Sequence, residues 1–231
     1  MIFQFKKFAV SHGNSSMRVG TDAVLLGAWA EIKNSENILE IGTGCGIIAL
    51  MLAQRNEKAN ITAIDIHAES VKEASRNFKE SQWTDRLNVE EISFQNFKCQ
   101  NKFDHIISNP PFFTASTPAP NKARHQARHT DTLSPLDFFI NSKMLLEPAG
   151  LISIIIPFIN SENWFKMAEQ YGFFPSRITN VLSYPGKSAE RILVEFSQNK
   201  KEKIENDFFI RKGKGLSYSD EYIEMTKEFY L

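Results

Sequence analysis

Seven short apolar runs, most of them separated by helical patterns, are the feature that most constrains how this chain folds. Near-continuous apolar strands alternating with helices predict a mostly parallel sheet with helices on both faces. The expected strands are residues 37–42, 61–66, 87–92, 103–108, 151–156, 176–183 and 191–197. The expected helices between them are residues 46–54, 68–80, 135–146 and 162–170. Ser134 is the expected cap of the third helix, so the pattern predicts an α/β fold with defined helix starts.

Composition indicates a single-domain protein without a membrane span or a metal site. The 231 residues show no repeat and no linker, so we expect a single domain over residues 1–231. No apolar run approaches the roughly 18 residues of a membrane span, and the start, MIFQFKK, is not a signal peptide. The two cysteines suit a reducing cytoplasm, and neither they nor the five histidines fit a metal site. A formal net charge of zero argues against indiscriminate nucleic-acid binding, but it is compatible with a local basic face.

Glycines and an acid follow the first two predicted strands, where ligands of parallel sheets bind. The loop after the first strand, EIGTGCG, contributes Glu40, Gly42, Gly44 and Gly46. Glycine allows both a sharp turn and a close approach of ligand to backbone. Asp65 lies 19 residues after Gly46, near the usual offset of an acid that binds ribose hydroxyls, and Ile66 follows it. These features indicate a cofactor that contains adenosine.

The glycine loop alone does not choose the cofactor. Gly44 to Ala49 also satisfies the G-x-G-x-x-A pattern of dinucleotide-binding proteins, so a nicotinamide dehydrogenase remains an alternative. Glycines that serve only a tight turn between strand and helix give the same pattern.

A rigid turn after the fourth strand separates these alternatives. Ser108 is followed by Asn109, Pro110, Pro111 and Phe112. The side-chain oxygen of Asn109 and the carbonyl of Pro110 can accept both hydrogens of a planar amino group on a base. This orients the amino group and frees its lone pair for in-line attack on a sulfonium methyl, with the base stacked on Phe112. A dehydrogenase leaves the turn unexplained, so we expect methyl transfer to an amino nitrogen, with residues 109–112 as catalytic residues.

The N-terminal segment, residues 1–35, is expected to cover the cofactor. Thr21 or Asp22 can cap a helix over residues 23–32. The positive end of that helix favours a carboxylate such as that of a methionine moiety. We therefore expect Arg18, Thr21 and Asp22 to line the entrance of the cofactor site.

The motifs at residues 40–46, 65 and 109–112 resemble those of class I methyltransferases that act on amino nitrogens. Over nearly its whole length the chain is similar to the bacterial tRNA (adenine-N6)-methyltransferases, which modify adenine 37, next to the anticodon of tRNA1(Val). The segments particular to that family are FAV (8–10), RVGTDAVLLGAW (18–29), ARHT (127–130) and PGKSAER (185–191).

The resemblance implies a Rossmann-like fold, with a seven-stranded, mostly parallel sheet whose last strand is antiparallel. It also implies S-adenosyl-L-methionine as the methyl donor, with Asp65 on its ribose, and tRNA as the partner. Family members usually carry an acid after the third strand, on the cofactor adenine; here Ser93 precedes Phe94. We expect the serine to hydrogen-bond and the Phe94 ring to pack on that adenine.

Three other readings stay open. Protein glutamine-N5 methyltransferases of release factors use nearly the same turn, generally with Tyr in place of Phe112. Guanine-N2 methyltransferases of rRNA are also similar. A non-catalytic RNA-binding protein is compatible only with a relic of a cofactor site, and no motif here looks degraded.

Basic residues follow the catalytic turn in the expected substrate loop, residues 114–133. We expect Lys122, Arg124, Arg128, Lys187 and Arg191 to contact RNA, because phosphate binding needs local positive clusters. Residues 200–231 are expected to form a C-terminal tail. The site looks complete within one chain, so we expect a monomer.

Overall fold

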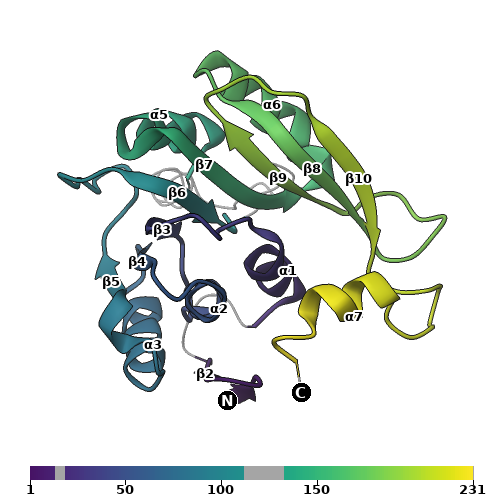
Figure 1. Ribbon diagram of the computed structural model, residues 1–231, viewed down its shortest axis with the longest axis horizontal. Helices are drawn as coiled ribbons and strands as arrows, with labels where there is room; N and C mark the ends of the chain where they lie inside the picture. Colours follow the sequence, from purple (N-terminus) through teal and green to yellow (C-terminus); the bar gives the residue numbers. More distant parts are fainter. Residues whose placement is uncertain (14–18, 112–132, 231) are drawn as a thin grey trace, which may run out of the picture.

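The computed structural model describes residues 1–13, 19–111 and 133–230, with the predicted sheet at its centre (Figure 1). The strands of this sheet are β3 (Asn37–Ile41), β4 (Asn60–Asp65), β5 (Leu87–Glu91), β6 (Phe103–Ser108), β7 (Leu146–Pro157), β8 (Phe174–Leu182), β9 (Arg191–Ser197) and β10 (Ile204–Phe209). The helices are α1 (Thr21–Trp29), α2 (Ile47–Arg55), α3 (Ala68–Lys79), α5 (Pro135–Leu145), α6 (Ser161–Gln170) and α7 (Asp220–Thr226), with 3₁₀ turns η1 (Thr84–Arg86) and η2 (Phe158–Asn160).

The strand order of the sheet is β10-β8-β9-β7-β6-β3-β4-β5. Neighbouring strands are parallel except around β9, which runs antiparallel to both β7 and β8. The expected seven strands and the antiparallel orientation of the last of them are therefore confirmed. An eighth strand, β10, comes from the residues expected to form a C-terminal tail. Most of its side chains are exposed, because it lies at the sheet edge, so no apolar run marks it in the sequence.

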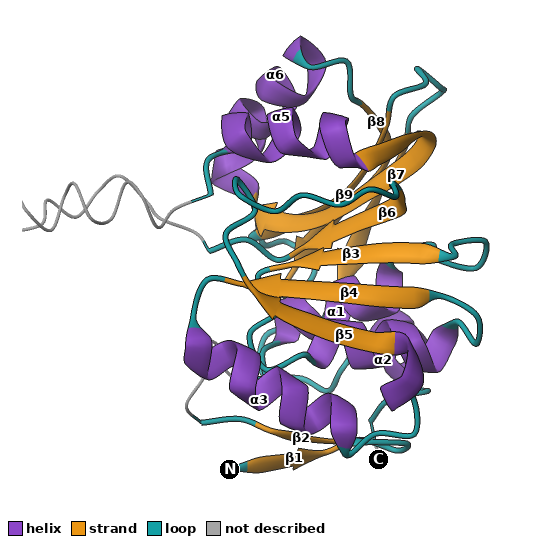
Figure 2. Ribbon diagram, turned by 90° about the vertical axis from the view of Figure 1, so that its left-hand side faces the viewer, coloured by secondary structure: helices purple, strands orange, loops and turns teal. Residues whose placement is uncertain are grey.

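Apolar side chains of the strands form two clusters, one on each face of the sheet, because successive side chains point to opposite faces. In β3, for example, Ile38 belongs to one cluster and Leu39 to the other. The first cluster includes residues of α1, α2, α3 and α7, and the second includes residues of α5 and α6 (Figure 2). Helices on both faces, as predicted, thus bury the sheet.

Side-chain caps were predicted for two helices, and one of these predictions was wrong. Ser134 caps α5 as expected, because its Oγ accepts a hydrogen bond from the Asp137 N–H at 3.1 Å. Helix α1 begins at Thr21 itself, with Gly20 as its N-cap and no side-chain cap. The Asp22 carboxylate is bound instead by Arg191 of β9, at 2.8 Å. Among the described residues, no side chain therefore accepts from the first N–H groups of α1.

The two ends of the chain lie together below the sheet (Figure 1). A hairpin of β1 (Ile2–Gln4) and β2 (Ala9–Ser11) precedes the domain core. The Lys6 N–H donates to the Phe229 carbonyl at 2.8 Å, and the Phe5 ring stacks on Tyr230 with centroids 5.9 Å apart. The hairpin thereby joins the C-terminal end to the helical layer of α1, α2 and α3.

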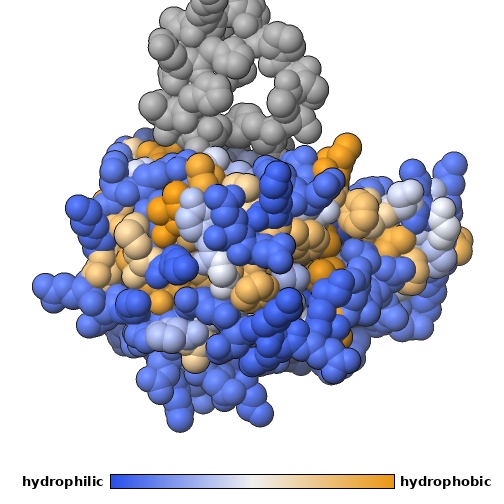
Figure 3. All heavy atoms as spheres, turned by 90° about the horizontal axis from the view of Figure 1, so that it is seen from above, coloured by the Kyte–Doolittle hydropathy of each residue, from blue (hydrophilic) through white to orange (hydrophobic). Residues whose placement is uncertain are grey.

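Polar side chains cover most of the face shown in Figure 3, and apolar side chains reach that surface in separate patches. Scattered exposed apolar groups of this kind are normal in folded proteins and need no partner. Within the described ranges, no helix has the length and apolar character needed to cross a membrane.

Candidate active site

The glycine loop turns sharply between β3 and α2. Gly42, Gly44 and Gly46 all adopt positive φ angles of 73°, 58° and 83°, which other residues adopt only with strain. The N–H groups of Gly42 and Thr43 donate to the Ile64 carbonyl at 2.8 and 3.1 Å, which ties the loop to the end of β4. A Cβ on Gly42 would meet nothing within 4 Å, so this glycine faces open space.

Glu40 lies beneath the loop and holds it. Its side chain is fully buried, and Oε2 accepts hydrogen bonds from Thr43 Oγ1 at 2.8 Å and from the Ala49 N–H at 3.1 Å. Burial raises the pKa of Glu40 to about 8, and the nearby Asp65 carboxylate acts in the same direction. These contacts fix the loop against the first turn of α2.

Asp65 ends β4 beside the same loop. Its Oδ2 accepts from the Gly44 N–H and its Oδ1 from the His67 N–H, both at 2.9 Å. A carboxylate oxygen has two lone pairs, so each oxygen retains capacity for a ligand hydroxyl. The next side chain, Ile66, is 39% exposed.

Ser93 and Phe94 follow β5, the neighbour of β4. The structure places the Phe94 ring in the core, 3% exposed and 5.8 Å from the Phe138 ring. Ser93 is partly exposed next to it.

The turn after β6 begins at Ser108, whose Oγ donates to the Ile41 carbonyl at 2.9 Å and joins the ends of β6 and β3. Asn109 is 5% exposed. Within the described part of the chain its buried Oδ1 has no hydrogen-bond partner. Buried polar oxygens are almost always paired, so an unpaired one suggests a missing ligand. Pro110 is buried and Pro111 is exposed.

One cavity of about 360 Å³, a volume within the range of small-molecule sites, opens here. The predicted residues Glu40, Gly46, Asp65, Ile66, Ser93 and Phe94 are not among the described residues that line it. It is lined by the starts of α1 and α2, the glycine loop and Asn109. Neither helix has a side-chain N-cap, so the positive ends of both face the same space. The cavity therefore combines two anion-attracting helix ends with one unpaired amide oxygen.

Of the predicted cofactor residues, Thr21, Asp22, Gly42, Gly44 and Asn109 line this cavity. Sequence reasoning missed six further lining residues: Gly20, Ala23, Thr43, Cys45, Ile47 and Ile48. Their only signal in the sequence was that each lies within two residues of a predicted one, because they belong to the same two segments.

Several predicted residues lie elsewhere. Arg18, Phe112, Lys122, Arg124 and Arg128 lie outside the described residues. Lys187 is exposed in the turn between β8 and β9, and Arg191 begins β9. The Asp22–Arg191 ion pair joins a residue predicted for the cofactor to one predicted for RNA.

Comparison with known proteins decides the family. Residues 12–156 match the methyltransferase small domain family. A relative from Phocaeicola vulgatus named tRNA1(Val) (adenine(37)-N6)-methyltransferase is 43% identical over 99% of this chain and 97% of its own length. Relatives of the same name from Trichodesmium erythraeum and Vibrio vulnificus are 41% and 37% identical, over 99% of this chain and 97% and 95% of their lengths. The chain belongs to the tRNA1(Val) (adenine(37)-N6)-methyltransferase family. The family expected from the sequence is thus confirmed, and with it the methyltransferase class.

Solved structures support the fold of this family member. A predicted O-methyltransferase from Agrobacterium tumefaciens has a TM-score of 0.68 at 19% identity, over 90% of this chain and 96% of its own. A ribosomal protein L11 methylase from Lactobacillus delbrueckii has a TM-score of 0.59 at 17% identity, over 83% and 84%. The Rossmann-like class I fold is therefore confirmed.

Proposed function

We propose that this chain transfers a methyl group from S-adenosyl-L-methionine to N6 of adenine 37 in tRNA1(Val). The observation that carries the proposal is the unpaired, buried Oδ1 of Asn109 in the cavity that also contains the glycine loop. Membership of the family supports the choice of tRNA and of adenine.

The described residues fit the methyl donor. The positive ends of α1 and α2 would hold the carboxylate of its methionine part, and Asp65 its ribose hydroxyls. Gly42 leaves room for close approach, because its missing Cβ would point into open space. Ile66 and Ser93 are proposed to contact the adenine, with the buried Phe94 ring supporting that end of the site. Arg18 and Glu40, which the sequence also indicated, are proposed to contribute to the cofactor site as well. When bound, S-adenosyl-L-methionine supplies an electrophilic methyl group.

Asn109 orients the nucleophile. An amino group donates one hydrogen to the Asn109 side-chain oxygen and the other to the Pro110 carbonyl, which favours a pyramidal nitrogen whose lone pair is no longer delocalised into the ring. No strong base is needed in that step, since the nitrogen sheds its proton after the new bond to carbon has formed. Positioning and exclusion of water supply the acceleration. Phe112 is proposed to stack on the same base.

The RNA side of the proposal rests on basic residues. Lys122, Arg124 and Arg128, which lie outside the described residues, are proposed to contact phosphates near the target, together with Lys187 and Arg191. A single-stranded loop suits the site, because its bases can be turned out and stacked. We also propose that the enzyme acts as a monomer in the cytoplasm, with no metal.

A protein glutamine methyltransferase is the nearest competing function. Incubation with labelled S-adenosyl-L-methionine and either tRNA or release factor separates the two. The proposal predicts label in tRNA alone. Label only in release factor would exclude the RNA substrate, and label on guanine would favour the guanine-N2 alternative.

Asn109→Ala tests the role of the turn. We expect a loss of roughly 10²–10³-fold in kcat, the usual cost of removing one oriented hydrogen-bonding group. The Kd for S-adenosyl-L-methionine, measured by calorimetry, should change little. Unaltered turnover would contradict the role assigned to Asn109.

A further inference from the structure

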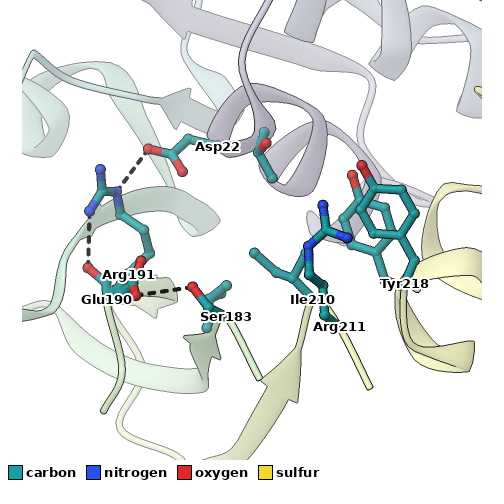
Figure 4. A pocket seen from close by; sticks show the side chains of 10 residues that line it. Asp22, Ser183, Glu190, Arg191, Ile210, Arg211 and Tyr218 are labelled. Atoms are coloured by element: carbon teal, nitrogen blue, oxygen red, sulfur yellow. Dashed lines mark hydrogen bonds and ion pairs between the residues drawn. The ribbon is translucent and has the colours of Figure 1, made fainter. Parts of the chain in front are cut away.

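A second cavity, of about 300 Å³, is shown in Figure 4. It opens at the same edge of the sheet as the candidate active site. Strands β8 and β10 end there and β9 begins there, since β9 is antiparallel to β8. Thr21 and Asp22, at the start of α1, line both cavities. The two cavities therefore meet at the start of α1.

A column of stacked planar groups forms one wall of this cavity. The Tyr218 and Tyr222 rings are stacked with centroids 4.6 Å apart and an interplanar angle of 15°. The Arg211 guanidinium lies over the Tyr218 ring, 4.7 Å from its centroid, and lies on the cavity side of that ring in Figure 4. The backbone holds this arrangement, because Arg211 and Tyr218 form an antiparallel bridge and Arg211 Nη1 donates to the Leu216 carbonyl at 2.9 Å.

The opposite wall is polar, with Asp22, Glu190 and Arg191, and Arg211 of the first wall offsets its remaining negative charge. Arg191 Nε binds Asp22 Oδ2 at 2.8 Å, and Ser183 Oγ donates to Glu190 Oε1 at 3.0 Å. The charged side chains on the walls are two acids and two arginines, so the cavity has no net formal charge. It suits a neutral, flat, hydrogen-bonding group better than a phosphate.

We propose that this cavity binds an unpaired nucleobase of the RNA substrate, adjacent to the base that is methylated, stacked on the guanidinium of Arg211. RNA-binding proteins commonly stack unpaired bases on aromatic rings or on arginine planes. Here Tyr218, half exposed and backed by Tyr222, keeps the guanidinium plane in place. The inference rests on the proposed function, because it presumes an RNA substrate at Asn109.

Steady-state methylation of an unmodified tRNA1(Val) transcript tests the site. Arg211→Ala should raise KM for the transcript by roughly 5- to 150-fold, the range that corresponds to one lost base stack, with kcat little changed. Arg211→Lys should show a similar loss, because lysine keeps the charge without the plane. Tyr218→Phe should behave as the wild type, since it keeps the ring.

Lys200→Ala is the matched control. It also removes one positive charge that lies over an aromatic ring, 5.6 Å from Phe174, but at the start of β8 and so at the opposite edge of the sheet. Its KM should not change. A wild-type KM in Arg211→Lys would overturn the stacking role, and so would weaker binding of S-adenosyl-L-methionine by Arg211→Ala, which would assign the cavity to the cofactor.

Cross-linking of the wild-type chain avoids any folding defect of the variants. Transcripts that carry 4-thiouridine beside the target adenine should cross-link to peptides that contain Arg211 or Tyr218. Cross-links confined to other peptides would overturn the inference. Failure of the wild-type chain to methylate RNA would instead contradict the proposed function, whereas methylation with unchanged KM in both Arg211 variants would overturn only the second site.

Discussion

At the scale of single residues, Glu40 shows how burial changes the chemistry of a motif. Its carboxyl is fully buried, and burial raises its pKa from 4.5 to about 8. Between pH 4.5 and about pH 8 the folded chain holds a proton on the Glu40 carboxyl that the unfolded chain has released. The Glu40 carboxyl therefore lowers the free energy of unfolding as the pH rises from 4.5 to about 8, and its effect levels off above about pH 8.

Glu40→Gln should remove this dependence. The amide oxygen can still accept from Thr43 and Ala49, so the contacts that hold the loop survive. Urea unfolding between pH 5 and 8.5 should show a flatter curve for the variant, which gains stability relative to the wild type as the pH rises. Parallel curves for the two proteins would contradict the raised pKa.

Some residues of the candidate site could be predicted from the sequence, and others could not. Asp65 and Asn109 were found because each lies at the carboxyl end of an apolar strand, and parallel strands bring these ends to one edge. The Asp22–Arg191 pair was not found, because its partners lie 169 residues apart and meet only once α1 packs under β9. Thr43 and Cys45, which also line the cavity, were not found either.

At the scale of elements, the turn from β3 to α2 is built for glycine. A Cβ on Gly46 would lie 2.6 Å from Phe78 Cε1 of α3, and φ there is +83°. Gly46→Ala should cost about 2–5 kcal/mol of unfolding free energy, from backbone strain plus overpacking. Gly186→Ala is the control, because φ there is +85° but nothing lies within 4 Å, so only the strain of about 1–2 kcal/mol remains. Equal losses in urea unfolding would show that contact with Phe78 does not matter.

Strands with a strongly apolar sequence, such as β6 and β9, were predicted together with their boundaries. Strand β10 and the hairpin of β1 and β2 were not predicted. Their pairing depends on partners distant in the chain: β8 for β10, and the C-terminal residues around Phe229 for the hairpin. Short exposed strands carry little local pattern, so sequence alone does not mark them.

At the scale of the whole molecule, cofactor binding should couple to global stability. The candidate site draws on α1, α2 and the ends of β3, β4 and β6, so the site exists only in the folded chain. S-adenosyl-L-methionine at about 100 times its Kd should stabilise the fold by about 2.7 kcal/mol, or a Tm increase of roughly 5–10 °C. NAD at the same concentration should leave Tm unchanged in a thermal-shift assay. The reverse pattern would favour the dehydrogenase alternative.

The central claim is N6 methylation of adenine 37 in tRNA1(Val), and nucleoside mass spectrometry of that tRNA tests it most directly. The purified chain, S-adenosyl-L-methionine and an unmodified transcript should yield N6-methyladenosine at that position, close to one per molecule, and far less over the same time with Asn109→Ala. The same nucleoside should be missing from the tRNA of a deletion strain. An unmodified adenine after incubation with the wild-type chain, or a methyl group found only on guanine, would contradict the account.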